Sequence, residues 1–429
     1  MNEDARLQVP AQAPGRHYGM DWLRIGAFGL LIFYHIGMFY VPWDWHVKAD
    51  PVLDWVALPM FLTNNWRLAL LFAVSGYASA AIVAKRAGQG PRPQTGPRTG
   101  VGAFLRQRSA RLLVPLLFAM AVVVPPQPWV ELTVKHGYAH GFGWFWLHDY
   151  FRFGDLYGIK LPTWQHLWFV AYLWAYTVVL AGLLMLPGRW RAWARATFDR
   201  VLGHPAMLLV LPLAWLLLVG LVLFPGREDT HGLLDDGGAH LRYLPVFLFG
   251  FALLRAGRVW DAIRRSWRPA LVLAMAAYAI VAAIELRYPG NTPAPAALVP
   301  VFVAARLANG WWMVVAAIGI ADRFWNRDHR WRATLNEAVF PFYMIHQTII
   351  VVVAWWCLRA GMPNGASFPL LVAATVAGCW LFYRIGRAVP GLRLLIGLRG
   401  WRVPAPGVAP QAGGMTSPAN CGTYRTDAA

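Results

Sequence analysis

The first long apolar stretch of the chain, residues 22–42, contains two ionisable side chains, Arg24 and His35. On an α-helix their separation leaves a rotation of about 20°, so both side chains share one face, roughly 16 Å apart along the axis. An arginine at the rim of a membrane can bind phosphate or carboxylate bidentately. A histidine deeper in the membrane can act as a general base, because its ordinary pKa lies near neutrality. We therefore take Arg24 and His35 as the leading catalytic candidates.

Each of these residues also has a purely structural interpretation. An arginine near the end of a membrane span often extends to the lipid headgroups and only anchors the helix. A buried histidine is often a neutral packing residue that is hydrogen-bonded to its neighbours. Both alternatives stay open for either residue alone, and the placement of the two on one helix face favours a functional role.

Further polar residues occur in stretches that lipid would surround. A charge inside a membrane is costly, so Arg67 in the second apolar stretch requires an acidic partner or a ligand, and that stretch contains no carboxylate. Ser75 precedes Gly76, which makes a small polar spot suited either to close helix packing or to a ligand. The other candidates are His166, Trp168, Arg306, Tyr343 and His346.

Neither a metal nor a permanently bound cofactor is expected. His35, His166 and His346 are conceivable metal ligands, but their spacing matches no metal-binding pattern. The three cysteines also lack paired spacing, so neither a disulfide framework nor a zinc site is indicated. Walker loops, dinucleotide fingerprints and G-x-S-x-G elbows are missing from the sequence.

The elements that must position these residues are membrane helices. Of the 429 residues, 58% are hydrophobic and only 14% are charged, whereas soluble proteins carry about 25% charged residues. The apolar residues occur in runs of about twenty, the length of a helix that crosses a bilayer. We predict an all-α, polytopic membrane protein with about ten transmembrane helices. The predicted spans are 22–42, 60–84, 112–130, 164–187, 206–225, 241–254, 269–286, 299–321, 338–358 and 367–383.

The basic residues give this bundle an orientation. The net charge of +19 would suggest a nucleic-acid partner in a soluble protein, but membrane proteins concentrate Lys and Arg in cytoplasmic loops. The segments on the N-terminal side of the predicted membrane hold 28 Lys and Arg, and those on the other side hold 8. Both termini are therefore predicted to be cytoplasmic.

The same pattern divides the chain into three parts. Residues 1–21 form a polar cytoplasmic segment, residues 22–387 the transmembrane domain, and residues 388–429 a cytoplasmic, largely disordered tail rich in Pro and Gly. The first apolar stretch lacks a small-residue cleavage site, so we interpret it as a retained helix and not as a signal peptide. The longest outer loop, 131–163, is rich in aromatic residues and histidines.

The ordered motifs resemble those of the membrane acyltransferase-3 family. Arg24, ten residues and His35 are similar to the R-X10-H signature of that family. Trp66-Arg67 with Phe72–Tyr77, His166–Phe169 and Phe342–His346 follow in the family's order, over about residues 17–387. The residues around His35 are most similar to the glucan-biosynthesis branch of the family.

The resemblance implies a membrane-bound O-acyltransferase of the bacterial cytoplasmic (inner) membrane. Such an enzyme moves an acyl group, commonly acetyl or succinyl, from cytoplasmic acyl-CoA to a hydroxyl of an extracytoplasmic glycan. It implies His35 as the base, with Arg24, Arg67 and Ser75 towards acyl-CoA. The acceptor would meet the remaining candidates, which are His166, Trp168, Arg306, Tyr343 and His346. Direct transfer and a covalent acyl-enzyme both stay open.

The main rival hypothesis is a transporter or flippase for a glycan or a lipid-linked sugar. It predicts movement of the substrate without consumption of acyl-CoA, and it requires a continuous polar path instead of one face with Arg and His. A second rival is a non-catalytic membrane scaffold, in which the buried Arg and His are only paired structural residues.

Overall fold

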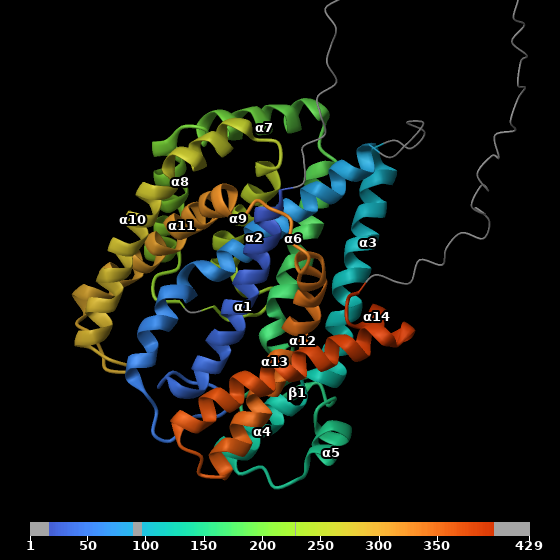
Figure 1. The fold of residues 1–429 in the computed structure, drawn as a ribbon, viewed down its shortest axis with the longest axis vertical. Helices are drawn as coiled ribbons and strands as arrows, with labels where there is room; N and C mark the ends of the chain where they lie inside the picture. The colour runs from blue at the N-terminus through green and yellow to red at the C-terminus, as the bar shows by residue number, and fades with distance from the viewer. Residues whose placement is uncertain (1–16, 89–96, 228, 399–429) are drawn as a thin grey trace, which may run out of the picture.

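The computed structural model describes residues 17–88, 97–227 and 229–398, and these are predominantly helical (Figure 1). Four parts of the chain lie outside this description: residues 1–16 of the predicted N-terminal segment, residues 89–96, residue 228, and residues 399–429 of the predicted tail 388–429. The helices of the first half are α1 (Tyr18–Tyr40), α2 (Ala57–Gly88), α3 (Pro97–Phe118), α4 (Pro126–His136), α5 (Phe142–Trp144), α6 (Trp168–Leu184) and α7 (Gly188–Val201). Those of the second half are α8 (Pro205–Leu217), α9 (Gly237–Leu253), α10 (Gly257–Arg287), α11 (Val299–Phe324), α12 (Arg332–Arg359), α13 (Asn364–Ala388) and α14 (Pro390–Leu395).

All ten predicted spans fall on helices, because apolar stretches of this length must satisfy their backbone hydrogen bonds internally in a membrane. The described residues contain eight helices that are long and apolar enough to cross a bilayer, or nine if one bent pair forms a single span. The predicted number of ten also included 241–254. That stretch falls on α9, which has 17 residues and is shorter than a typical span.

The bent pair is the stretch predicted as a single helix over 112–130. The helical segment Gly100–Val123 ends in a π-helical turn, Ala119–Val123, and meets α4 at an angle of 41°. Pro125 and Pro126 lie at the break. A proline lacks the backbone N–H and its ring clashes with the preceding turn, so two consecutive prolines end the first helix and start the next in a new direction.

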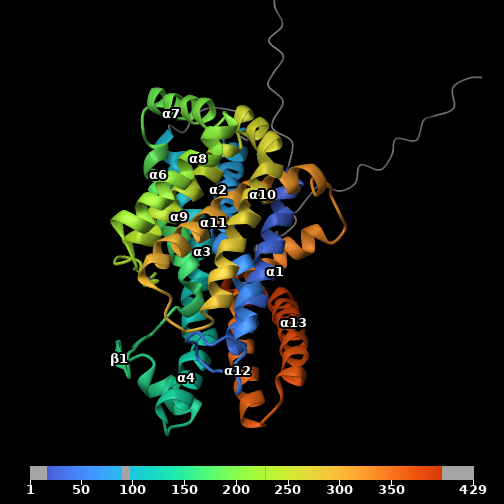
Figure 2. The same cartoon turned by 90° about the vertical axis from the view of Figure 1, so that its left-hand side faces the viewer.

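Two predicted loops lie at opposite ends of the bundle (Figures 1 and 2): residues 188–205, which connect two predicted spans on the N-terminal side of the predicted membrane, and the outer loop 131–163. Figures 1 and 2 show α7 lying across one end, while α4 lies near the other. The outer segment also contains the antiparallel hairpin of β1 (Gly154–Leu156) and β2 (Ile159–Leu161). Which end faces the cytoplasm stays a prediction from the distribution of Lys and Arg.

Glycines bring α2 and α9 into direct backbone contact. A Cβ atom at Gly76 would lie 1.9 Å from the Phe247 carbonyl oxygen, and one at Gly250 would lie 1.8 Å from that of Ala73. Neither distance is compatible with a side chain, so only glycine permits this approach. Of the two roles proposed for the Ser75-Gly76 spot, close helix packing is the one that Gly76 performs.

Candidate active site

His35 and His346 form a hydrogen-bonded pair inside the bundle. His35 Nδ1 lies 2.8 Å from His346 Nε2, and His346 Nδ1 lies 2.8 Å from the carbonyl oxygen of Tyr343. A carbonyl oxygen can only accept, so His346 Nδ1 carries the hydrogen and, in the neutral ring, Nε2 is the acceptor. His35 must then donate from Nδ1. The Nε2 atom of a neutral His35 is therefore unprotonated, as a general base requires.

Hydrogen bonds between His166, which lies just before α6, and Tyr343 connect this pair to α6. The Nε2 atom of His166 lies 3.0 Å from the Tyr343 carbonyl oxygen and donates to it, while the Tyr343 hydroxyl donates back to the carbonyl oxygen of His166. His166 and His346 thus share one backbone acceptor. These reciprocal bonds fix the turn of α12 that carries His346, so His166 acts here as a positioning residue.

The three histidines lie close together, yet they do not form a metal site. Their ring centroids are separated by 5.0 to 6.3 Å. Both nitrogens of His346 are engaged, and His166 Nε2 is a donor, so their lone pairs do not converge on one point. The described residues contain no group of three His, Cys, Asp or Glu side chains that could hold a metal ion.

His35 faces a polar cavity of about 530 Å³ between α1, α2, α6, α9, α11 and α12. Phe224, Gly226, Arg227, Asp229 and His231, from the segment before α9, also line it. Among the candidates from the sequence, His166, Trp168, Arg306 and Tyr343 also line the cavity. The polar lining that the sequence alone did not indicate comprises Tyr34, Asn64, Asn65, Arg227, Asp229, His231, Arg242 and Tyr243.

Arg67 is the most deeply buried cation of this cavity, with 1% of its surface exposed. Its guanidinium lies 4.2 Å from the centroid of the Tyr34 ring, and Nη2 donates to Asn64 Oδ1 across 3.3 Å. Its Nε and Nη1 atoms are buried and have no partner. Among the described residues no carboxylate pairs with Arg67, so two donors of a buried cation remain free for a ligand.

Three further arginines, Arg227, Arg242 and Arg306, make the cavity electropositive. Arg306 donates from Nε to Asn65 Oδ1 across 3.0 Å, and Arg242 forms an ion pair with Asp229. Among the described residues of the lining, Asp229 therefore offsets only part of the positive charge. Burial raises the pKa of the Asp229 carboxyl, and the neighbouring Arg242 opposes that rise. The cavity is suited to an anion or to a group that becomes negative during a reaction.

The segment before α9 packs against the Trp168 side chain. The Trp168 and His231 rings are stacked with centroids 4.5 Å apart, and Trp164 Nε1 donates to the His231 carbonyl oxygen across 3.1 Å. Burial lowers the pKa of His231, which favours the neutral ring. One face of Trp168 is thus covered by His231, which leaves less of the ring for the predicted contact with the acceptor.

Arg24 and Ser75 are not among the residues that line this cavity. Arg24 instead lies near two other arginines, Arg108 and Arg111, which repel it electrostatically. Arg108 is buried, and its Nε atom has no hydrogen-bond partner. The nearby Asp21 is paired with Arg332 across 2.7 Å. The structure therefore separates Arg24 from His35 and places Arg24 in its own arginine cluster.

A buried polar network next to the histidines was not predicted. His46 Nδ1 donates to Glu131 Oε2 across 2.6 Å, and Gln347 Nε2 donates to His46 Nε2 across 3.1 Å. Gln347 also donates to Gln127 Oε1 across 3.0 Å. Gln127 in turn donates weakly to His166 Nδ1 across 3.5 Å. His46 and Glu131 fall in two predicted loops, so no spacing in the sequence connects them.

Comparison with known proteins identifies the family to which this site belongs. The model of a family described as an acyltransferase domain matches residues 17–384. The chain belongs to this acyltransferase family. Both members of the His35–His346 pair lie inside the matched region, as do His166 and the cavity arginines.

The curated relatives of the acyltransferase are more distant. Glucans biosynthesis protein C from Escherichia coli O1:K1 and from strain E24377A is 28% identical over 169 residues, which is 38% of this chain and 37% of the relative. The protein of the same name from strain K12 is 27% identical over 168 residues. The match thus covers less than half of the length of each relative. No solved structure matches this chain.

Proposed function

We propose that this multi-pass membrane acyltransferase moves an acetyl or succinyl group from cytoplasmic acyl-CoA to a hydroxyl of a glycan outside the bacterial inner membrane. The observation that carries the proposal is that His35, whose Nε2 is unprotonated in the neutral ring, lines the same cavity as Arg67, whose Nε and Nη1 have no partner. The name of the relatives, glucans biosynthesis protein C, supports a glucan as the acceptor.

In the proposed reaction His35 first accepts one proton and then donates it. The acceptor hydroxyl gives its proton to Nε2 of His35, and its oxygen attacks the carbonyl carbon of the thioester. The C–S bond then breaks, and the CoA thiolate takes the proton from Nε2. The hydrogen bond from His35 to His346 stabilises the imidazolium that exists between these steps.

Arg67 is the best-placed donor to the negative oxygen of the tetrahedral intermediate. Its free Nε and Nη1 atoms are buried, where an interaction with a developing charge is stronger than in water. The described residues that line the cavity include no Ser, Thr or Cys. The lining therefore supports direct transfer over a covalent acyl-enzyme on one of those residues.

The arginine cluster around Arg24 supports the binding of the CoA phosphates. Arg24, Arg108 and Arg111 concentrate positive charge, and an anionic ligand would relieve their mutual repulsion. In the predicted orientation this cluster lies towards the cytoplasm, on the side where acyl-CoA is present. Arg24 then binds the donor, while His35 carries out the chemistry further along the same helix.

The decisive experiment distinguishes the binding of acyl-CoA from the transfer of the acyl group. In detergent, acetyl-CoA or succinyl-CoA raises the melting temperature of the purified protein, because a ligand that binds only the folded state stabilises it. Arg24→Ala reduces that response. His35→Ala keeps the response but does not acylate the glucan, and His136→Ala, a change at an exposed histidine of the outer segment, behaves as wild type.

Two results would contradict the proposal. Full acylation by His35→Ala would remove the assignment of the base. A folded protein that responds to none of the acyl-CoA compounds, nor to free CoA, would favour the transporter hypothesis.

A further inference from the structure

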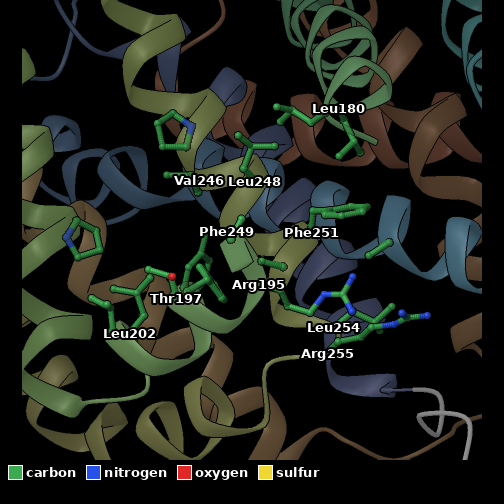
Figure 3. Close-up of a pocket in the computed structure, with 18 of the residues that line it drawn as sticks. Leu180, Arg195, Thr197, Leu202, Val246, Leu248, Phe249, Phe251, Leu254 and Arg255 are labelled. Carbon is green, nitrogen blue, oxygen red and sulfur yellow. The ribbon is translucent and has the colours of Figure 1, made fainter. Parts of the chain in front are cut away.

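A second cavity lies between α2, α6, α7, α8 and α9, and no step of the proposed reaction uses it. Its volume is about 1130 Å³, roughly twice that of the cavity around His35. Most of its lining is apolar, and Figure 3 shows Leu180, Val246, Leu248, Phe249 and Phe251 around it. We call this cavity the apolar groove.

The apolar groove borders the lipid-facing side of the bundle. Helix α8 contributes Leu211, Trp215 and Leu216 to it, and only 11% of the most apolar window of Pro205–Leu223 is buried inside the protein. Water does not fill a large apolar space favourably. A hydrocarbon chain from the surrounding membrane is the occupant that this lining suits.

One end of the groove carries positive charge. Arg191 and Arg195 on α7 and Arg255 after α9 all line it. In Figure 3, Arg195 and Arg255 lie near Leu254 on the side away from Leu180. No described carboxylate forms an ion pair with any of the three arginines, and the buried Nε atom of Arg191 has no partner.

Helix α7 has the composition of a helix at a membrane surface. Its Trp190 and Trp193 are exposed by 52% and 63%, and four arginines are distributed along its 14 residues. Tryptophan and arginine are typical of the interface between headgroups and hydrocarbon. The charged end of the groove therefore lies at headgroup depth, and its apolar part extends into the hydrocarbon layer.

We propose that the apolar groove binds an anionic phospholipid. Its phosphate lies among Arg191, Arg195 and Arg255, and one acyl chain follows the groove between α6 and α9. CoA would also bring phosphates, but the amide groups of its pantetheine arm would find almost no hydrogen-bond partners along this lining. Charge at one end and hydrocarbon along the rest match a phospholipid.

The bound lipid also contacts the wall of the active cavity. Leu216, Arg242, Val246 and Trp311 line both the groove and the cavity that contains His35. An acyl chain in the groove therefore supports these side chains from the opposite side. This inference does not depend on the proposed acyl transfer, because the lipid is a resident ligand and not a reactant.

The test measures lipid binding to the purified, full-length protein by native mass spectrometry. Phosphatidylglycerol and phosphatidylcholine with identical chains are compared, and glycerol phosphate serves as the headgroup without a chain. Wild type is expected to retain phosphatidylglycerol preferentially and to show no binding of glycerol phosphate. Arg195→Gln with Arg255→Gln weakens phosphatidylglycerol binding roughly 25-fold, about fivefold for each charge.

Matched control variants distinguish lipid binding in the apolar groove from lipid binding elsewhere on the protein surface. Arg200→Gln with Arg258→Gln removes the same charge from exposed arginines that do not line the groove, so binding stays at the wild-type level. Ala194→Trp fills the groove and removes binding of both lipids, whereas Ala196→Trp on the same helix does not.

A measurement on wild type alone keeps the proposal testable if a variant does not fold. Phosphatidylglycerol with a photoreactive group in its acyl chain should label peptides of α6 and α9 that line the groove. Labelling confined to other surfaces, equal affinity for both lipids, or unchanged binding by folded Ala194→Trp would each overturn the proposal.

Discussion

His346 Nε2 accepts a hydrogen bond from His35 Nδ1 across 2.8 Å, and this bond leaves Nε2 of the neutral His35 ring unprotonated. The direction of the bond follows from the backbone of α12, whose Tyr343 carbonyl oxygen holds the hydrogen of His346 on Nδ1. His346, which is not among the residues that line the cavity, thus sets the protonation state of the proposed base.

Replacing His346 should therefore impair turnover more than binding. In His346→Ala, His35 loses its acceptor and samples both tautomers, so kcat falls by up to about 10²–10⁴-fold, the contribution of a general base. The KM for acyl-CoA changes little, since the arginine cluster at Arg24 is untouched. Steady-state kinetics check this, and a change confined to KM would contradict the positioning role.

Arg67 should act on the transition state. Loss of one buried donor to an oxyanion lowers kcat by about 10²–10³-fold, and we expect this effect for Arg67→Gln. Arg67→Lys should not restore activity, because an ammonium cannot reproduce the fork of donors above the Tyr34 ring. Arg359→Gln, at the end of α12, is the matched control. Wild-type turnover in Arg67→Gln would exclude the role.

Glu131 should contribute to stability through His46. The pair is largely buried, and Glu131→Gln leaves His46 without its charged partner, which costs about 1–3 kcal/mol. Asp44→Asn is the control, because Asp44 is 89% exposed and its bond to Lys135 contributes about 0–1 kcal/mol. Thermal unfolding in detergent compares the two. Equal losses of stability in both variants would show that the buried His46–Glu131 pair stabilises the protein no more than the exposed Asp44–Lys135 pair does.

Lys48 should titrate below the usual range of a lysine. Burial lowers its pKa from 10.5 to about 8, and its Nζ atom donates to the Met38 carbonyl oxygen across 2.5 Å. Between pH 8 and 10.5 Lys48 is protonated in the unfolded chain but neutral in the folded protein. The free energy of unfolding therefore increases as the pH rises from about 8 to 10.5. Labelling with an amine-reactive ester, read by mass spectrometry, should give a midpoint near pH 8. A midpoint near the usual value for lysine in the folded protein would contradict this expectation.

The helices were predictable from the sequence, but their breaks were not. Apolar stretches of about twenty residues have one stable form in a membrane, so every predicted span is helical. The prolines at 125 and 126 were visible, yet the bend also depends on the π-helical turn before them. The inner loop 188–205 contains the helix α7, because its arginines and tryptophans suit an interface that a hydropathy argument does not describe.

The site was predictable only as a set of residue types. His35, His166 and His346 stood out because polar groups in lipid are costly, and the structure brings the three together. Their hydrogen-bond directions depend on backbone carbonyls that no sequence pattern displays. The pairing of His46 with Glu131 joins segments 85 residues apart, and only the packed bundle brings them into contact.

Gly76 and Gly250 have a consequence for the size of the molecules that the enzyme can accept. Helix α2 carries Arg67, and α9 carries Arg242, and the backbones of these helices touch where the glycines lie. The separation of the two cations, and with it the width of the cavity that we propose to bind the substrate, therefore depends on two residues that have no side chain. A methyl group at either position would force the helices apart, so substrate selectivity can be altered from a place that no substrate reaches.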